Sequence, residues 1–362
     1  MMIWLGAAAQ GRDNNFNLIR MLAASAVLVS HTWPMVYGPG TIEPLEMLTG
    51  HTLGSFAVYV FFALSGFFIS ASFARSGSVL AFLAARCLRL FPSLAVSLFI
   101  VALILGPLAT SLSTADYLAD RETWTFLVRN MTLWHAQYTL PGVFEVNPYP
   151  AVEGSIWTLI QEVMCYGLVF LAGIAGLLWR RQYMTAALFG YAALWLWPVA
   201  FSLPLPIKLT QLHELSLPFV LGMTFWLWRD RIPLSLVGIA GLAVLAFATR
   251  ETLLALPAMM LFLTYTIFWL GHVPQGWVRR YNKLGDYSYG MYVYAFPLQG
   301  AVVWLWGPML PTNHIVAAFP ITLIFAILSW HFVEAPALAL RWRAPAKEQR
   351  QTSSVAQRKG SG

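Results

Sequence analysis

Cysteine and charged residues are both scarce in this chain. Only 2 of its 362 residues are cysteine, and 10% are charged. Cys87 falls in a predicted loop and Cys165 midway along an apolar run, so no disulfide framework can be drawn between them. The sequence also lacks internal repeats, a glycine-rich phosphate loop and a metal-ligand cluster of recognisable spacing. A disulfide-stapled secreted domain and a P-loop enzyme are therefore excluded, and we expect no metal.

Apolar residues take the place of charge. Hydrophobic residues make up 59% of the chain and aromatic residues 15%, with a mean hydropathy of +0.65, which is far outside the range of soluble domains. A helix of about 20 residues crosses ~30 Å of hydrocarbon. Ten runs are long enough, near 16 to 37, 53 to 73, 90 to 110, 155 to 178, 183 to 201, 212 to 228, 232 to 249, 253 to 271, 287 to 306 and 314 to 336. We predict an all-α, polytopic integral membrane protein with about ten transmembrane helices.

The basic residues predict the orientation of these helices. If the N-terminus is cytoplasmic, the inner segments hold 17 of the 22 lysines and arginines, and the outer segments hold 4, Arg121, Arg129, Lys208 and Arg250. Positive residues are retained on the cytoplasmic side, so both termini are expected there, in the cytoplasmic (inner) membrane. The net charge of +7 is then a topology signal, and nucleic acid is not an expected partner.

The domain organisation is predicted to be simple. Residues 1–343 form a single membrane-embedded domain, and 344–362 are polar, charged and free of aromatics, which is typical of a disordered tail. The N-terminal MMIWLGAAAQ is too short for the regions of a signal peptide, so we expect no cleavage.

The first apolar run carries two costly polar side chains, Arg20 and His31. They are eleven positions apart, which on a helix is three turns plus about 20°, so they share one face about 16 Å apart along the axis. Each alone would be explained by snorkelling or by a bond to a neighbouring helix. Together they favour an interior cavity that reaches from the inner side past mid-membrane, because ionisable groups in a membrane usually face such a cavity.

Other apolar runs carry charged side chains that could act together with Arg20 and His31. Glu162 lies about two turns after Ser155, a depth similar to that of His31, so its carboxylate is expected to orient the imidazole; a purely structural Glu–His bond is the alternative. Arg86 and Arg89 are three residues apart on one helical face, a geometry able to grip a phosphate. The alternative reading of these arginines is that they only set topology.

These residues lie in motifs whose order resembles the membrane acyltransferase-3 family, in its stand-alone, polysaccharide O-acetylating branch. The motifs are the Arg-x10-His pair, FFALSGFFI, RCLRLFP, SIWTLIQEVMCY, LGDYSYGMYVYAFP and FVEAP, and they span about residues 14 to 340. The resemblance implies a bundle of ten or slightly more helices. It also implies transfer of an acyl group, commonly acetyl, from cytoplasmic acetyl-CoA or another acyl-CoA to a hydroxyl of a glycan outside the membrane. That glycan is a surface or exported polysaccharide or its lipid-linked precursor.

The resemblance also assigns roles to residues of this chain. His31 would be the general base on the acceptor hydroxyl, with Glu162 orienting it. Arg20, Arg86 and Arg89 would hold the anionic groups of the donor. Further candidates for substrate contact or structure are Asn17, Ser65, Gly66, Trp157, Tyr287, Ser288 and Tyr289, while Glu334 with Pro336 is interpreted as structural.

Asn17 departs from the family pattern, in which many members have Asp three residues before the first-run arginine. Either Asn17 hydrogen-bonds to Arg20 in place of that carboxylate, or Arg20 keeps its charge for a ligand. We expect no appended extracytoplasmic domain. A route through an acyl-Ser65 intermediate is a secondary hypothesis, since Ser next to Gly in an apolar helix usually serves close packing.

Other functional classes stay open on the sequence. A glycan or lipid-linked sugar transporter would share the many spans and the intramembrane Arg and His, and a membrane sensor or assembly subunit is a further class. Within the family, the acceptor could be a small hydrophobic molecule such as an antibiotic. In the outer segment 111 to 154, Trp124, Trp134, His135 and Tyr138 could stack on sugars, but an interfacial aromatic belt is the favoured reading.

Overall fold

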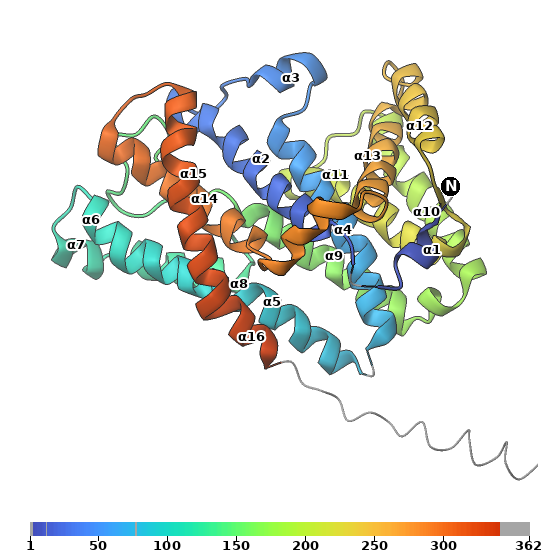
Figure 1. Cartoon of the computed structure of the whole chain (residues 1–362). Helices are drawn as coiled ribbons and strands as arrows, with labels where there is room; N and C mark the ends of the chain where they lie inside the picture. The colour runs from blue at the N-terminus through green and yellow to red at the C-terminus, as the bar shows by residue number, and fades with distance from the viewer. Residues whose placement is uncertain (1–2, 12, 77, 341–362) are drawn as a thin grey trace, which may run out of the picture.

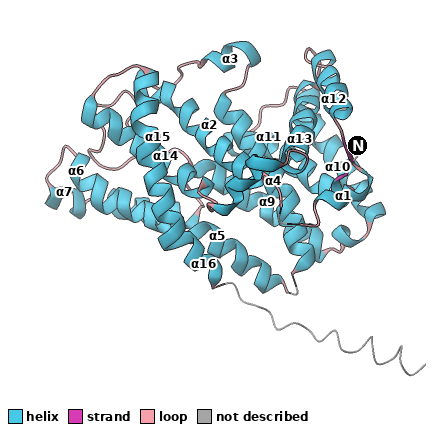
Figure 2. Cartoon of the chain, viewed as in Figure 1, coloured by secondary structure: helices cyan, strands magenta, loops and turns pink. Residues whose placement is uncertain are grey.

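A computed structural model describes residues 3–11, 13–76 and 78–340, and about three quarters of these residues are helical (Figures 1 and 2). The predicted tail at 344–362 lies outside the described residues. The α-helices are α1 (Leu5–Ala8), α2 (Phe16–Tyr37), α3 (Pro44–Thr49), α4 (Leu53–Arg75), α5 (Val79–Ile100), α6 (Gly106–Ala109), α7 (Thr114–Ala119), α8 (Arg121–Thr132), α9 (Ile156–Ile174), α10 (Arg181–Ala200), α11 (Ile207–Leu227), α12 (Leu236–Ala248), α13 (Ala255–His272), α14 (Ser288–Trp306), α15 (Pro311–Ser329) and α16 (Ala335–Ala339).

Shorter elements complete the chain. Three are 3₁₀ turns, η2 (Leu177–Trp179), η3 (Arg229–Arg231) and η4 (Gly276–Lys283), and two are π-helical, η1 (Val101–Leu105) and η5 (Trp330–Glu334). Strands β1 (Ile3–Trp4) and β2 (Pro233–Leu234) pair antiparallel, with Ile3 opposite Leu234.

Each of the ten predicted runs coincides with a helix or with helices joined end to end. Six of these are long and apolar enough to cross a membrane, namely Leu53–Arg75, Val79–Ala109, Ile156–Ile174, Arg181–Ala200, Ala255–His272 and Pro311–Ala339. Helices α2, α11 and α14 have 19 to 22 residues but a lower mean hydropathy than these six candidate spans require, and α12 has only 13 residues. The described residues therefore establish a multi-pass helical membrane protein.

The third predicted run begins earlier than its hydropathy suggested. Helix α5 starts at Val79, and the run continues through η1 and α6 to Ala109, which gives 31 residues or roughly 46 Å. Arg86 and Arg89 consequently lie within the helix rather than at its start. At this position in α5 the two side chains can face the interior of the bundle, whereas side chains in a loop at the membrane surface need not do so.

Helix α2 lies at the centre of the fold, where it contacts α4, α14 and α15 (Figure 1). Helix α4 in turn packs closely on α11, because small residues let their backbones meet. A Cβ at Gly66 would lie 1.9 Å from the carbonyl oxygen of Phe219, and one at Gly222 would lie 1.9 Å from that of Ala63. Gly66 therefore serves helix packing, which agrees with the favoured interpretation of the Ser-Gly pair.

Candidate active site

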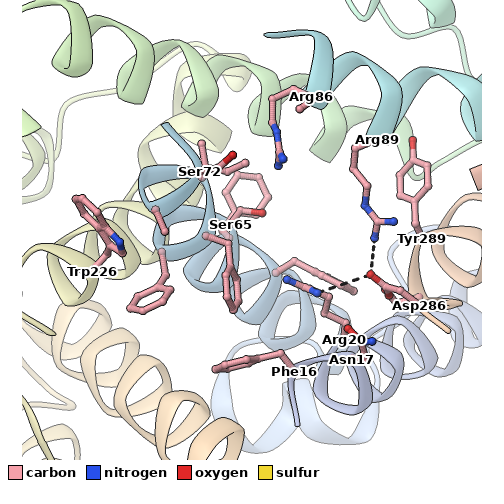
Figure 3. Close-up of a pocket in the computed structure, with 18 of the residues that line it drawn as sticks. Phe16, Asn17, Arg20, Ser65, Ser72, Arg86, Arg89, Trp226, Asp286 and Tyr289 are labelled. Carbon is pink, nitrogen blue, oxygen red and sulfur yellow. Dashed lines mark hydrogen bonds and ion pairs between the residues drawn. The ribbon is translucent and has the colours of Figure 1, made fainter. Parts of the chain in front are cut away.

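Two cavities lie along the axis of this central bundle. The larger has a volume of about 1420 Å³ and is bounded by parts of α2, α4, α5, α9 and α14 (Figure 3). Five arginines line it, Arg20, Arg75, Arg86, Arg89 and Arg229. We call it the arginine cavity. Its volume exceeds the 300–1,000 Å³ typical of small-ligand sites, so an extended ligand fits it.

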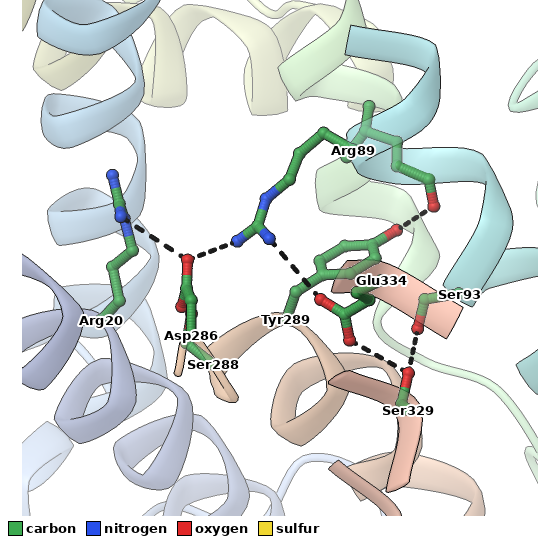
Figure 4. Close-up of polar contacts among 9 residues, drawn as sticks. Arg20, Arg89, Ser93, Asp286, Ser288, Tyr289, Ser329 and Glu334 are labelled. Carbon is green, nitrogen blue, oxygen red and sulfur yellow. Dashed lines mark hydrogen bonds and ion pairs between the residues drawn. The ribbon is translucent and has the colours of Figure 1, made fainter. Parts of the chain in front are cut away.

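Asp286 joins two of these arginines. Its Oδ2 lies 2.7 Å from Arg89 Nη2 and 3.7 Å from Arg20 Nη1 (Figure 4). Burial alone would raise the pKa of the Asp286 carboxyl, but Arg89 and Arg20 outweigh it and hold that pKa below its usual value. Ser288 adds a hydrogen bond of 2.5 Å to Oδ1. Asp286 is therefore an ionised anchor that fixes both guanidinium groups.

A second carboxylate approaches Arg89 from the other side. Glu334 Oε2 lies 3.5 Å from Arg89 Nη1, and Glu334 Oε1 accepts a hydrogen bond of 3.0 Å from Ser329, which also contacts Ser93 at 2.8 Å (Figure 4). Glu334 ends the π-helical segment η5, where the amide of Ala335 bonds to the carbonyl of Trp330 five residues earlier. The wider turn precedes Pro336, whose ring cannot supply the regular amide bond.

Arg86 differs from Arg20 and Arg89, which are paired with carboxylates. Its Nε is buried, and it forms no hydrogen bond or salt bridge within the described part of the chain. It points into the arginine cavity from α5, while Arg20 enters from α2 (Figure 3). Because Arg86 is half-buried and pairs with no carboxylate of the described residues, it is available for an anionic ligand.

Ser65 and Glu162 meet in the same cavity. Ser65 Oγ donates to Glu162 Oε1 at 2.8 Å, and the hydroxyl of Tyr166, one turn further along α9, donates to the same oxygen at 2.5 Å. The structure thus brings two predicted site residues together, and it gives Glu162 partners other than the predicted histidine.

His31 lines the smaller cavity, which has a volume of about 320 Å³. Its Nδ1 is buried without a hydrogen-bond partner among the described residues, and its ring packs edge-on against Phe296 at a centroid distance of 5.3 Å. We call this space the histidine cavity. Trp33 and Trp157 also line it, which places the predicted candidate Trp157 beside His31.

The two cavities are stacked end to end. Both are bordered by Val58, Thr158 and Tyr292, and the hydroxyls of Thr158 and Tyr292 hydrogen-bond to each other. On α2 the arginine cavity takes the N-terminal half and the histidine cavity the C-terminal half, and on α4 the order is reversed. This antiparallel pattern shows that they follow one another along the helix axes.

The predicted contact between Glu162 and His31 is not formed. Glu162 lines the arginine cavity and His31 the histidine cavity, with Thr158 and Tyr292 at the boundary between them. Counting residues from the outer surface placed the two side chains at one depth, but α9 puts Thr158, one turn before Glu162, at that boundary. In the described structure Glu162 therefore does not orient the imidazole.

The remaining predicted residues are distributed around the arginine cavity. Asn17, Ser288 and Tyr289 line it, and the Tyr289 hydroxyl donates to the Leu90 carbonyl at 2.7 Å while its ring lies under Arg89. Asn17 forms no hydrogen bond to Arg20 within the described residues, because Asp286 supplies the carboxylate instead. Tyr287 lies outside the cavity and donates to the carbonyl of Leu284.

The outer aromatic segment lies away from both cavities. Trp124, Trp134 and Tyr138 are 48%, 83% and 41% exposed, and neither they nor His135 line either space. The tryptophans that share a cavity with His31 are instead Trp33 and Trp157. This arrangement agrees with the favoured reading of the segment as an aromatic belt.

Sequence reasoning missed Asp286 and the carboxylates of the histidine cavity. Asp286 was quoted within LGDYSYG, yet its role depends on arginines 197 and more residues away. Glu43, Glu46 and Glu214 also line the histidine cavity. Glu43 and Glu46 fall in a predicted outer segment, where acidic residues carry no local signal of this kind, and Glu214 lies near the outer end of the predicted run 212 to 228. Within 3–11, 13–76 and 78–340, no group of three His, Cys, Asp or Glu side chains is placed to hold a metal ion.

Comparison with known proteins identifies the family of this chain. A family model for an acyltransferase domain matches residues 13–331. The O-acetyl transferase of Shigella phage Sf6 is 27% identical over 347 residues, which cover 89% of this chain and 95% of the phage protein. Nodulation protein 10 of Rhizobium leguminosarum bv. viciae is 29% identical over 235 residues, 61% of this chain and 59% of that protein. No solved structure matches. Because the model spans nearly the whole helical region, the chain belongs to the membrane acyltransferase-3 family.

Proposed function

We propose that this protein is an O-acetyltransferase that moves an acetyl group from cytoplasmic acetyl-CoA to a hydroxyl of a surface or exported glycan. The observation that carries the proposal is the stacking of two unlike cavities, one rich in arginine and one containing an unpartnered histidine. The name of the phage relative supports acetyl as the group and oxygen as the acceptor atom.

The arginine cavity is the proposed donor site. The phosphates of acetyl-CoA need cationic partners, and the unpartnered Arg86 lies in this cavity beside Arg20 and Arg89. The basic residues predict that this end of the bundle faces the cytoplasm, where acyl-CoA is made. An extended pantetheine arm would direct the thioester along the axis toward Tyr292 and Thr158.

His31 is the proposed general base. An alcohol is a poor nucleophile at neutral pH, and a positioned base typically contributes about 10² to 10⁴ in rate. His31 takes the proton of the acceptor hydroxyl as its oxygen attacks the thioester carbonyl carbon. The tetrahedral intermediate then collapses with cleavage of the carbon–sulfur bond, and the thiolate takes the proton from the imidazolium. Because no described residue forms a hydrogen bond with His31, its ring is free to bond the incoming hydroxyl.

The test compares surface polysaccharide from several hosts, and it is paired with an assay of acetyl-CoA consumption by the purified protein. Proton NMR would compare polysaccharide from a deletion host with that from hosts complemented by wild type, by His31→Ala or by His135→Ala. His135 is exposed and lines neither cavity, so it is a matched control. We expect an O-acetyl signal with wild type and the control only. A normal signal with His31→Ala at equal protein level would reject the base assignment.

The other functional classes give different outcomes in the same experiment. Consumption of acetyl-CoA by the purified protein without any change in polysaccharide would indicate a small hydrophobic acceptor. Failure to consume acetyl-CoA, together with export of a glycan or lipid-linked sugar, would indicate a transporter.

A further inference from the structure

The two cavities differ sharply in the charges that line them. The arginine cavity has five arginines beside three carboxylates, Glu162, Asp230 and Asp286. The histidine cavity has three carboxylates and no lysine or arginine among the described residues that line it. Among those described residues, His31 is the one side chain that can accept a proton to become cationic. A molecule that enters the histidine cavity therefore meets a negative potential, whereas acetyl-CoA in the arginine cavity would meet a positive one.

Each of these carboxylates is held in place. Glu43 is 3% exposed, and it accepts hydrogen bonds from Ser30 at 2.6 Å and from the amide of Leu53. Glu46 completes the capping box of α3 with Glu43. Glu214, from α11, accepts a hydrogen bond from Tyr59, and no other described residue bonds to it. Ionised carboxylates accept but do not donate hydrogen bonds, so these fixed carboxylates favour a ligand that carries hydrogen-bond donors.

Two further features indicate that a ligand belongs here. The buried Nδ1 of His31 has no hydrogen-bond partner in the part of the chain that the structure describes, although a buried polar atom without one costs free energy. Trp33 and Trp157 contribute indole rings to the same wall. Carbohydrates present many hydroxyl donors and flat apolar faces, which match the carboxylates and the indoles respectively. The volume of about 320 Å³ is at the lower end of the range for small-ligand sites.

We propose that the histidine cavity is the acceptor site, and that it selects sugar residues that are neutral or carry an amino group over sugars that carry a carboxylate or a phosphate. The proposal rests on the proposed function and adds the class of sugar that receives the acetyl group. A uronate or phosphosugar would bring a negative charge against Glu43, Glu46 and Glu214, and like-charge contacts of this kind oppose binding strongly. The sugar hydroxyl donates to a fixed carboxylate while the neighbouring hydroxyl faces His31.

The first measurement is to locate the ester in the native polysaccharide. Two-dimensional NMR of polysaccharide from the complemented and deleted hosts identifies the sugar that carries the gene-dependent acetyl group. A neutral or amino sugar is expected. An ester on a uronate, sialate or phosphosugar would overturn the acceptor assignment while leaving acetyl transfer intact. The absence of any gene-dependent ester would reject the proposed function and the acceptor class together.

The second measurement uses matched acceptors with the purified full-length protein. Methyl glycosides of glucose, galactose and mannose are paired with their uronate counterparts, and transfer from labelled acetyl-CoA is counted. For every hexose that is used, we expect its uronate to react at least about 100-fold more slowly. A uronate used as well as its neutral partner would contradict the proposal.

A variant tests the carboxylates directly. Glu214→Gln keeps the size of the side chain and its hydrogen bond from Tyr59 but removes one charge. We expect the KM for the neutral acceptor to rise and the discrimination against the uronate to fall at least tenfold, with the KM for acetyl-CoA changed much less. Glu251→Gln, on an 85% exposed residue outside the cavity, is the matched control. A change in donor KM alone would place Glu214 outside the acceptor site.

Discussion

Replacing Asp286 by Asn tests the anchoring of the donor arginines. The cluster of Arg20, Arg89, Asp286 and Glu334 has two formal positive and two formal negative charges, so it is neutral. The substitution leaves one positive charge without a partner. At an effective dielectric constant of about 20, Coulomb's law gives attractions of about 6 kcal/mol at 2.7 Å to Arg89 and about 4.5 kcal/mol at 3.7 Å to Arg20. Desolvation opposes these attractions, and breaking such buried pairs costs about 3–5 kcal/mol.

The assay has a stability arm and a kinetic arm. In detergent or nanodiscs, Asp286→Asn should lower the free energy of unfolding by about 3–5 kcal/mol. The kcat/KM for acetyl-CoA should fall about 10- to 100-fold, because Arg89 is then drawn toward Glu334 and leaves its position. Asp286→Glu, which keeps the charge, should recover part of both losses.

A double-mutant cycle separates charge balance from packing. Arg89→Gln alone leaves Glu334 and Asp286 with one positive partner, whereas Asp286→Asn with Arg89→Gln restores a neutral cluster. The double variant should therefore be more stable than the sum of the two single losses predicts, by about 0.5–3 kcal/mol. Asp13→Asn, whose carboxylate is 75% exposed beside Arg279, should cost no more than about 1 kcal/mol. Additive losses, or an Asp286→Asn variant with unchanged stability, would refute the anchoring role.

Three further predictions concern packing, the acyl route and pH. Gly66→Ala should destabilise the protein by about 1–3 kcal/mol or more, because the new Cβ would meet the backbone of α11. The control Gly241→Ala in α12, where the Cβ would enter open space, should be neutral or stabilising. Equal effects of the two substitutions in thermal melts would contradict the close packing of α4 on α11. Ser65→Ala removes a hydrogen bond to Glu162 but should keep transfer within about tenfold, since direct transfer needs no serine nucleophile; acetyl label that stays on denatured wild type and is lost in the variant would establish a covalent route instead. Burial raises the pKa of the Glu153 carboxyl from 4.5 to about 8 and outweighs the opposing amide hydrogen bonds. The contribution of Glu153 to the free energy of unfolding is therefore fully present below pH 4.5 and is lost as the pH rises toward and through 8, by about 1.4 kcal/mol per pH unit between these values. Glu153→Gln should flatten this dependence and be more stable than wild type at pH 8, and parallel melting curves for the two proteins would refute the assignment.

The sequence by itself determined the class of the protein and the positions of its helices. Apolar runs bounded by proline, glycine and charge mark the helices wherever one segment decides its own conformation, and the ten runs coincide with helices for this reason. Boundaries were less well determined, as α5 shows. Its first turns contain charged residues that hydropathy assigns to a loop, although the helix extends through them.

The common face of Arg20 and His31 was also available from helical geometry, because it depends on spacing within one helix. That these residues line two cavities rather than one was decided by Thr158 and Tyr292, which come from other helices and meet between them. The pairing of Glu162 with His31 failed for the same reason. Depth counted along a sequence does not specify how far one helix is shifted against another.

The partners of the arginines were decided by tertiary structure alone. Asp286 is 266 residues from Arg20 along the chain, and Glu334 is 245 residues from Arg89. No periodicity or propensity links segments so far apart. Burial makes the links necessary, since a guanidinium inside the bundle needs a carboxylate, but only the packing of α14 and η5 beside α2 and α5 selects which carboxylate it is.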